Sequence, residues 1–148
     1  MAELRTYSAD RIFTGSAWLN AHSVLVRENR IIDVIPSASV NRSASSENFG
    51  ECFIAPAFVD LQIYGANGKL FAVYPETDSL DGLVDYCLEG GAAHCLPTVA
   101  TNETQVFFRS VDAVRKFWQE EGRGVLGLHF EGPWINKEKK GAHVEGLI

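Results

Sequence analysis

The sequence lacks the features that mark membrane, secreted and nucleic-acid-binding proteins. No apolar run approaches the roughly 20 residues that a helix needs to cross a bilayer. The first residues, MAELRTYSADRIF, do not follow the basic-then-apolar pattern of a signal peptide. The formal net charge of −6 gives no general excess of positive charge for nucleic acid or an anionic membrane. We therefore expect a cytoplasmic protein without nucleic-acid or membrane partners.

Cysteine is also scarce, and no cysteine-based or dinucleotide-binding motif is present. Cys52, Cys87 and Cys95 form an odd set without C-x-x-C spacing, so we expect reduced thiols and no zinc-cysteine site. No G-x-G-x-x-G follows the first apolar strand of the second region, which leaves a dinucleotide fold without support. An acidic protein can still have a locally basic site, so an anionic small substrate remains possible.

What is present is the composition of a globular protein, beginning with a β-rich region. Hydrophobic residues make up 46% and charged residues 22% of the 148 residues. HSVLVR and RIIDVI predict two strands joined by a tight turn at Glu28 and Asn29. The polar, serine-rich residues 37–50 predict a loop, and CFIAP predicts a returning strand. These patterns favour a small β-rich domain.

The second region alternates predicted strands and helices. AFVDLQIYG predicts a strand, and residues 78–89 predict a helix with Asp78 or Ser79 as its N-cap. AAHCLP is the next short apolar run. A second helix is expected over residues 103–120, with a capping box that starts at Asn102. VLGLHF, residues 125–130, predicts a strand buried on both faces.

One apolar face of the second helix is predicted from spacing. Its members recur at intervals of four, three and four residues: Phe107, Val111, Val114 and Trp118. The order β-α-β-α-β implies parallel strands with right-handed crossovers. Such a sheet is either doubly wound or the start of a (β/α)8 barrel.

Three polar residues favour the barrel, because they fall near the ends of predicted strands: Gln62, Thr98 and Glu131. Active residues of barrels lie at the carboxyl ends of their strands. A complete barrel takes about 250 residues, far more than this region contains. We therefore expect a truncated barrel.

Glu131 is the leading candidate for a functional residue. His129 and Glu131 should share one face of their strand, with Phe130 on the other. A carboxylate at the end of a buried strand must be paired, hydrogen-bonded or bound to a metal, so a structural ion pair is the alternative. His129 is a ligand, a core histidine or a group that orients its neighbours, and the core histidine is favoured. His143 follows in a polar loop and is either a surface residue or part of the same site.

A catalytic metal site usually takes three protein ligands. The residues above supply at most Glu131 with distant helpers, and Gln62 is a weak ligand whose alternative role is a hydrogen bond at the strand end. The sequence therefore predicts a metal-linked barrel site with most ligands missing.

Four stretches resemble segments of one family, the N-acetylglucosamine-6-phosphate deacetylases. GLHFEGPWINKEKKGAH (127–143) resembles the segment with the family's metal-binding glutamate. PAFVDLQIYGANG (56–68) resembles the first barrel strand, with Ala57 in place of the usual glycine. LPTVATN (96–102) resembles the end of the second strand. RIFTG (11–15) matches the N-terminal β-domain.

The resemblance covers essentially the whole chain and implies a metal-dependent amidohydrolase. The implied fold class is α/β, with part of a small β-sandwich domain and the N-terminal part of a (β/α)8 barrel. Residues 1–55 would belong to the sandwich. Residues 56–148 would be the first three strands and two helices of the truncated barrel.

The resemblance also implies an activity, the removal of acetate from N-acetyl-D-glucosamine 6-phosphate. By position, Glu131 would bind a divalent metal, and Ala142 and His143 would contact the amino-sugar phosphate. Gln62 lies where many amidohydrolases have the first histidine of a His-x-His pair, which implies one zinc ion rather than two. Gln62 and His129 would support these ligands.

The other metal ligands and the catalytic aspartate have no counterpart in this sequence. We therefore expect no catalytic residue within the chain and an N-terminal fragment that is inactive alone. The complete protein would form a homo-oligomer, either a dimer or a tetramer. The alternatives are another amidohydrolase, such as an N-acetylgalactosamine-6-phosphate deacetylase, and a non-catalytic module that binds sugar phosphates.

Overall fold

The computed structural model describes residues 3–40 and 45–148 of a mixed α/β chain. The chain divides into two compact units, Met1–Pro56 and Ala57–Ile148. Neither of the α-helices in the described residues is long and apolar enough to span a membrane. Each unit is described by itself below.

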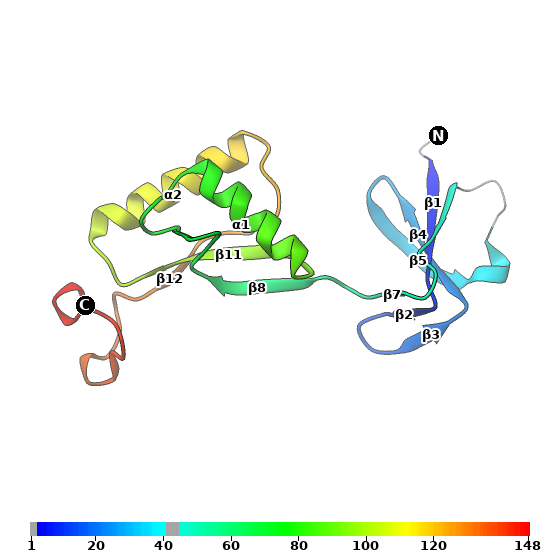
Figure 1. Ribbon diagram of the computed structural model, residues 1–148, viewed down its shortest axis with the longest axis horizontal. Coiled ribbons are helices and arrows are strands. Elements are labelled where there is room, and N and C mark those ends of the chain that lie inside the picture. The colour runs from blue at the N-terminus through cyan, green and yellow to red at the C-terminus, as the bar shows by residue number, and fades with distance from the viewer. Residues whose placement is uncertain (1–2, 41–44) are drawn as a thin grey trace. The chain divides into compact units, whose positions relative to one another are not determined.

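The first unit contains two small sheets (Figure 1). One has the strand order β5-β4-β1-β6, and the other has the order β3-β2-β7. A single turn of 3-10 helix, Ser37–Ser39, follows β5. The strands are β1 Leu4–Ser8, β2 Arg11–Phe13, β3 Trp18–Asn20, β4 His22–Arg27, β5 Arg30–Pro36, β6 Ser45–Asn48 and β7 Phe53–Ile54.

The predicted hairpin between β4 and β5 is confirmed. The strands pair antiparallel, with Arg27 opposite Arg30 next to the turn. Glu28 and Asn29 both have positive φ, 50° and 60°. Two consecutive left-handed residues match the right-handed twist of the flanking strands, so the turn continues the sheet without splaying it.

The predicted loop over residues 37–50 is wrong at Ser45–Asn48. These residues form β6, which pairs parallel with β1 and places Ser46 beside Thr6. All four residues of β6 are exposed. An edge strand on the surface needs no apolar alternation, so its polar sequence resembled a loop. Residues 41–44 of the predicted loop lie outside the described residues.

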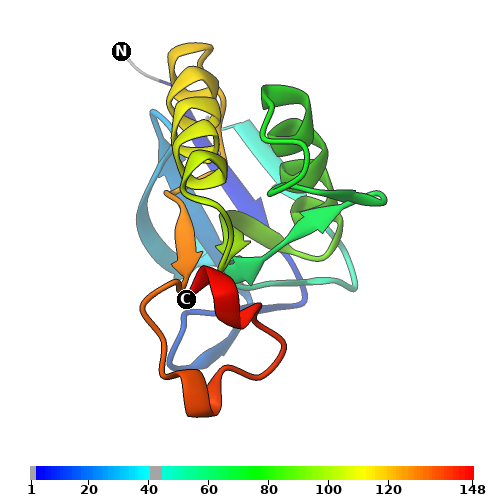
Figure 2. The ribbon, with the colours of Figure 1, turned by 90° about the vertical axis from the view of Figure 1, so that its left-hand side faces the viewer.

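The second unit places two helices over a parallel sheet, as the alternating pattern predicted. The sheet order is β12-β11-β8, and both pairings are parallel. Helices α1 and α2 lie side by side on one face of this sheet (Figures 1 and 2). The helices and strands are β8 Phe58–Ile63, β9 Gly65–Ala66, β10 Lys69–Leu70, α1 Thr77–Glu89, β11 Ala92–Ala100, α2 Thr104–Gln119 and β12 His129–Glu131.

The three parallel strands form an open sheet within the described residues, so a (β/α)8 barrel remains a prediction. Two turns of 3-10 helix, Lys137–Lys139 and Glu145–Leu147, follow β12. A small hairpin, β9-β10, follows β8. Its turn, Asn67-Gly68, again has two positive φ angles, 53° and 78°.

The core lies between the helices and the sheet. Side chains from both helices, from β11 and from the segment before α1 are buried there, among them Phe71, Leu80, Leu83, Val99, Val114 and Phe117. The two helices thus bury one apolar face of the three-stranded sheet, which is the packing that forms a layered core.

The predicted buried face of α2 is correct only in part. Val114 is buried, but Trp118 is 47% exposed and Phe117 is buried in its place. Ser110 is fully buried. A small residue lets the helix approach the core closely. The spacing of large apolar residues does not detect such a position, so the predicted face is shifted by about one residue from the observed one.

The helix caps also differ from the prediction. Glu76 precedes α1 and Glu103 precedes α2, and neither makes a side-chain capping bond. The Asn102 side chain instead accepts a hydrogen bond from the N–H of its neighbour Glu103, at 3.0 Å. The capping box predicted at Asn102 is therefore wrong.

The last strand is shorter than the expected 125–130 segment. Only His129–Glu131 forms β12, and Val125 makes an isolated bridge to Cys95. Gly127 lies between the two paired positions. Glycine weakens a strand interior because it has no side chain to pack and loses much conformational freedom.

Candidate functional site

The candidate site lies where the three parallel strands end. In the register of β11 and β12, Ala100 is paired with Glu131, the last residue of its strand. Thr101 follows β11, and Tyr64 follows β8 one residue after the strand ends. Because carboxyl ends of parallel strands meet at one edge of a sheet, these side chains converge.

A cavity of about 670 Å³ opens at this edge. Its walls come from the strand ends and from the loop that follows β12. The lining includes Tyr64, Thr101, Glu131, Lys140, Ala142 and His143.

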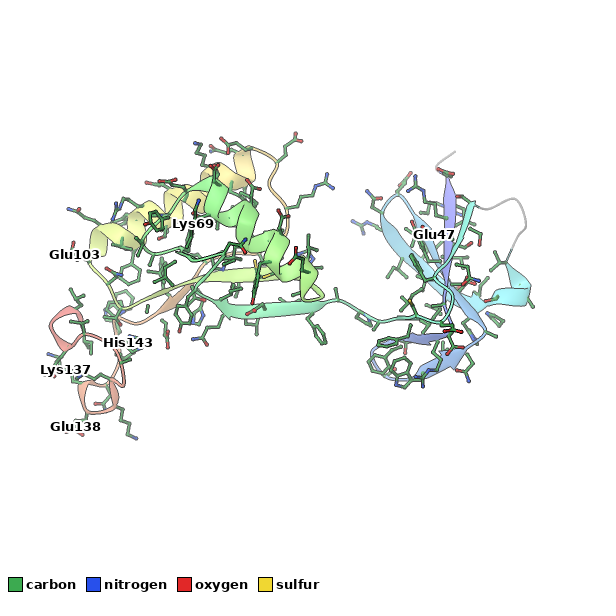
Figure 3. All side chains as sticks on the ribbon, viewed as in Figure 1. Glu47, Lys69, Glu103, Lys137, Glu138 and His143 are labelled. Atoms are coloured by element: carbon green, nitrogen blue, oxygen red, sulfur yellow. The ribbon has the colours of Figure 1, made fainter. Side chains whose placement is uncertain are left out.

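The loop after β12 is folded by its own turns, which bring His143 back to the sheet. Asn136 accepts a hydrogen bond from the N–H of Glu138 at 2.9 Å and thereby starts the first 3-10 turn. The N–H of His143 donates to the carbonyl of Lys140 at 3.0 Å across Gly141. Gly141 has a φ of +57°, which glycine adopts without steric cost. His143 lies nearer the strand ends than the side chain of Glu138, which projects from the outer turn (Figure 3).

Glu131 is the centre of the polar contacts. Its side chain is 33% exposed, and its Oε1 lies 3.5 Å from Nε2 of His143. Its Oε2 accepts a hydrogen bond from the hydroxyl of Tyr64. Glu131 therefore has one oxygen bound to the protein and one that faces the histidine.

Tyr64 links Glu131 to Gln62. The Nε2 of Gln62 donates to the Tyr64 hydroxyl at 2.7 Å. The pKa of Tyr64 is raised, mainly because its hydroxyl proton is held by Glu131, while the bond from Gln62 acts in the opposite direction. The backbone is also anchored, because the carbonyl of Tyr64 accepts from the N–H of Phe71 at 2.8 Å.

Thr101 contacts both His143 and the backbone of Glu131. It is 7% exposed, and its Oγ1 lies 2.8 Å from Nδ1 of His143. The same hydroxyl donates to the backbone carbonyl of Glu131 at 3.3 Å. His143 therefore contacts Thr101 with one ring nitrogen and Glu131 with the other.

The structure brings together most of the residues singled out from the sequence. Glu131, Ala142 and His143 all line the cavity, and Gln62 reaches Glu131 through Tyr64. His129 lies apart from the cavity lining and contacts Thr98, with its Nδ1 3.4 Å from Oγ1.

Thr98 was expected at the strand end and is misplaced. Strand β11 continues to Ala100, so Thr98 is fully buried inside it, and Thr101 takes the end position. The proline at position 97 suggested that the strand stops there. Tyr64 and Thr101 are the site residues that sequence reasoning missed. The available signal was their position directly after an apolar strand.

The donors present can supply only part of a metal site. Glu131 offers a carboxylate and His143 an imidazole, and zinc binds both groups. Within residues 3–40 and 45–148, no group of three or more His, Cys, Asp or Glu side chains could hold a metal ion. Three protein ligands are usual in a catalytic zinc site, so Glu131 fits as one member of a larger set.

Comparison with known proteins identifies relatives, although no family model matches the chain. The chain is 34% identical over 143 residues to the N-acetylglucosamine-6-phosphate deacetylase of Bos taurus. The alignment covers 93% of this chain and 35% of the bovine protein. The chain thus spans about a third of the length of this curated relative.

Solved structures of deacetylases resemble this chain in fold. The N-acetylglucosamine-6-phosphate deacetylase from Pasteurella multocida superposes with a TM-score of 0.89 at 27% identity, covering 98% of this chain and 38% of that one. A mutant N-acetyl-D-glucosamine-6-phosphate deacetylase from Mycobacterium smegmatis, in complex with N-acetyl-D-glucosamine-6-phosphate, gives a TM-score of 0.79 at 24% identity. It covers 99% of this chain and 36% of that one. In sequence and fold, the chain is a relative of the N-acetylglucosamine-6-phosphate deacetylase family and matches about a third of the length of its full-length members.

Proposed function

We propose that this chain carries part of the active site of a metal-dependent deacetylase. The reaction would be hydrolysis of N-acetyl-D-glucosamine 6-phosphate to D-glucosamine 6-phosphate and acetate. The observation that carries the proposal is the pairing of Glu131 with His143 across a cavity at the ends of parallel strands. The relationship to the deacetylase family supplies the reaction class.

Glu131 is the proposed metal ligand. One carboxylate oxygen is held by Tyr64, which fixes the side chain and leaves Oε1 directed toward His143. A divalent metal, zinc in our proposal, would supply a bound water of lowered pKa and polarise the amide carbonyl. The further ligands and the acid-base aspartate would come from residues outside those described.

The loop after β12 is the proposed sugar-contacting segment. Ala142 and His143 line the cavity, and the polar ring of His143 can exchange hydrogen bonds with a sugar hydroxyl. Lys139 and Lys140 also line the cavity and bring positive charge to it, although the whole chain carries a net charge of −6. Locally basic walls suit an anionic substrate such as a sugar phosphate.

The test is an acetate-release assay on the complete protein that contains this sequence. We expect turnover of N-acetyl-D-glucosamine 6-phosphate that depends on bound zinc, measured together with the metal content. Changing Glu131→Gln keeps the side-chain shape but removes the charge. It should reduce both activity and zinc affinity by at least about 100-fold, the upper end of losses seen when only the partners of metal ligands are changed, and the measured zinc content should fall with the affinity.

Glu138→Gln is the matched control. Glu138 lies in the same loop but projects from the outer turn and does not line the cavity (Figure 3). Activity close to that of the unmodified protein is expected. Full activity and zinc content in Glu131→Gln would contradict the proposal.

The same assay, run beside a measurement of sugar-phosphate binding, separates the alternative functions. Faster turnover of N-acetylgalactosamine 6-phosphate would indicate a deacetylase with the other sugar preference. Binding of either sugar phosphate without acetate release would indicate a non-catalytic module. Light scattering on the complete protein would test the dimer or tetramer that the family resemblance implies.

A further inference from the structure

The backbone at Tyr64 is held by the core and by the β9-β10 hairpin. Its carbonyl accepts a hydrogen bond from the N–H of Phe71 at 2.8 Å, and Phe71 is fully buried. Gly65 follows directly, and a Cβ atom at that position would collide with the backbone of Lys69. The chain therefore turns tightly against the hairpin immediately after Tyr64. The Tyr64 ring thus projects from a backbone that contacts on both sides hold in place.

Gln62, two residues before Tyr64, lies on the same side of the extended chain. Its own N–H donates to Oδ1 of Asp60 at 2.9 Å, which holds its backbone. The Nε2 of Gln62 donates to the Tyr64 hydroxyl at 2.7 Å. That hydroxyl in turn contacts Oε2 of Glu131. Side chains from the ends of two strands, β8 and β12, thus form one chain of hydrogen bonds.

The direction of this hydrogen-bond chain follows from the number of protons. A carboxylate that binds a metal is deprotonated, so Glu131 can only accept. The Tyr64 hydroxyl has one proton, and that proton must go to Glu131. The hydroxyl can then only accept from Gln62, so the amide presents its NH2 group to Tyr64 rather than its oxygen. No other assignment satisfies both contacts of the hydroxyl.

The two carboxylate oxygens of Glu131 therefore differ in their partners. Oε2 holds the Tyr64 proton. Oε1 lies 3.5 Å from Nε2 of His143, which is longer than the roughly 2.7–2.9 Å of a charge-assisted hydrogen bond. Glu131 lines the cavity together with Tyr64 and His143. Oε1 is thus the oxygen that remains for a cation in the cavity.

We propose that Tyr64 is a positioning residue that occupies Oε2 of Glu131 and so limits this carboxylate to binding a metal through Oε1 alone. That Glu131 binds a metal rests on the function proposed above. A carboxylate that gives one oxygen keeps the coordination number low. Zinc usually takes about four ligands, whereas calcium takes about six to eight oxygens, some from carboxylates that bind through both oxygens. The contact with Tyr64 therefore favours zinc over larger cations.

A crystal structure of the zinc-loaded complete protein tests the geometry directly. We expect Oε1 of Glu131 at about 2.0–2.2 Å from the metal, with Oε2 still hydrogen-bonded to Tyr64. Tyr64→Phe keeps the ring and loses the hydroxyl, so Oε2 should turn to within bonding distance of the metal. Zinc bound through both oxygens in the unmodified protein would overturn the proposal. Binding through one oxygen that persists in Tyr64→Phe would also overturn it.

Cobalt in place of zinc gives the same test in solution, independently of catalysis. The visible absorption of bound cobalt weakens when ligands are added to a tetrahedral site, so Tyr64→Phe should absorb less strongly than the unmodified protein. Its zinc affinity should fall by about 10-fold, the lower end of losses seen when a partner of a metal ligand is removed, because the freed oxygen offsets part of the lost support. Tyr86→Phe is the matched control, because Tyr86 is 53% exposed on α1. Equal cobalt spectra for the two variants would contradict the role of Tyr64.

The outcomes separate this inference from the proposed function. Zinc bound through both oxygens of Glu131, together with acetate release from N-acetyl-D-glucosamine 6-phosphate, would refute the inference and leave the proposed function standing. Binding through Oε1 alone, without any acetate release, would do the reverse. Zinc bound without any contact to Glu131 would refute both.

Discussion

Phe130 and Phe107 pack edge to face, with ring centroids 4.8 Å apart and ring planes at 78°. Phe130 is the middle residue of β12, and Phe107 lies on α2. Because neighbours in a strand point to opposite faces, this contact turns Phe130 toward the helices and Glu131 away from them. The aromatic pair therefore fixes the face on which the carboxylate lies.

This pair should contribute measurably to stability. A double-mutant cycle with Phe107→Ala and Phe130→Ala should give a coupling free energy of about 0.5–1.5 kcal/mol in urea unfolding. Phe108→Ala is the control, because Phe108 is 67% exposed and its loss should change the free energy of unfolding by less than about 0.5 kcal/mol. Additive effects of the two substitutions would show that the rings do not interact.

The cysteines should differ sharply in reactivity. Burial raises the pKa of both Cys87 and Cys95, that of Cys95 to about 12. At pH 8 a thiol of that pKa is ionised on the order of one part in ten thousand, and the thiolate is the reactive form. Cys52 is exposed. A thiol reagent should modify one cysteine rapidly in the folded protein and three after unfolding.

Cys52→Ser provides the control for the thiol experiment. It should abolish the rapid phase and leave only modification that follows unfolding. Rapid reaction of two or more thiols in the folded protein would contradict the buried positions of Cys87 and Cys95.

Stability should also depend on pH through Tyr64, whose folded-state pKa is raised by its bond to Glu131. The folded protein then holds the tyrosine proton more tightly than the unfolded chain. The stabilising contribution is complete below about pH 10 and is lost as pH rises through the raised pKa.

Absorbance of tyrosinate gives the measurement. The tyrosine that ionises last should be missing from Tyr64→Phe, and the unfolding free energy of that variant should fall less steeply above about pH 10. Tyr86→Phe is the control, because Tyr86 is 53% exposed. An identical alkaline profile in Tyr64→Phe and the unmodified protein would argue against the bond to Glu131.

The hairpin turn in the first unit can be improved by glycine. Asn29 has a φ of 60°, which costs energy for a residue with a Cβ and none for glycine. Asn29→Gly should therefore raise the free energy of unfolding, by up to about 1 kcal/mol because asparagine tolerates this conformation better than most residues. Thermal unfolding measures the change. Ala38→Gly, in an exposed 3-10 turn without positive φ, should lower stability instead.

The elements that sequence reasoning predicted well are those with strong local signals. The turn at Glu28-Asn29 lies between two alternating strands, and the helix expected over 78–89 is α1, Thr77–Glu89. Both depend on residues close together in the chain. The hairpin at Asn67-Gly68 has an equally strong turn signal, but its strands are only two residues long, too short to show an alternating pattern, and it was not predicted.

Features set by tertiary contacts were harder to predict. Strand β6 is polar throughout and exists because β1 offers it an edge. The buried face of α2 passes through Ser110, which no hydrophobicity pattern selects. In such cases the neighbouring element, rather than the local sequence, decides the structure.

The candidate site shows the same division. Glu131 and His143 could be singled out from residue type and position, and their approach to 3.5 Å follows from the turns of the loop between them. Thr101 could not be distinguished from Thr98 without the true end of β11. The hydroxyl that contacts both Glu131 and His143 was therefore visible only in three dimensions.

The strand order β12-β11-β8 also determines from which edge of the sheet a further strand would lie next to Glu131. Within the described residues, β12 and β8 each pair on one side only, and a free edge offers hydrogen-bonding groups to another strand. A parallel strand added beside β12 would end about 4.8 Å from Glu131 and become its immediate neighbour. A strand added beside β8 would lie at the opposite edge of the sheet, next to the strand that Tyr64 follows. Side chains on a strand added beside β12 could therefore contact the Glu131 carboxylate directly. Side chains on a strand added beside β8 would be separated from it by β8 and β11.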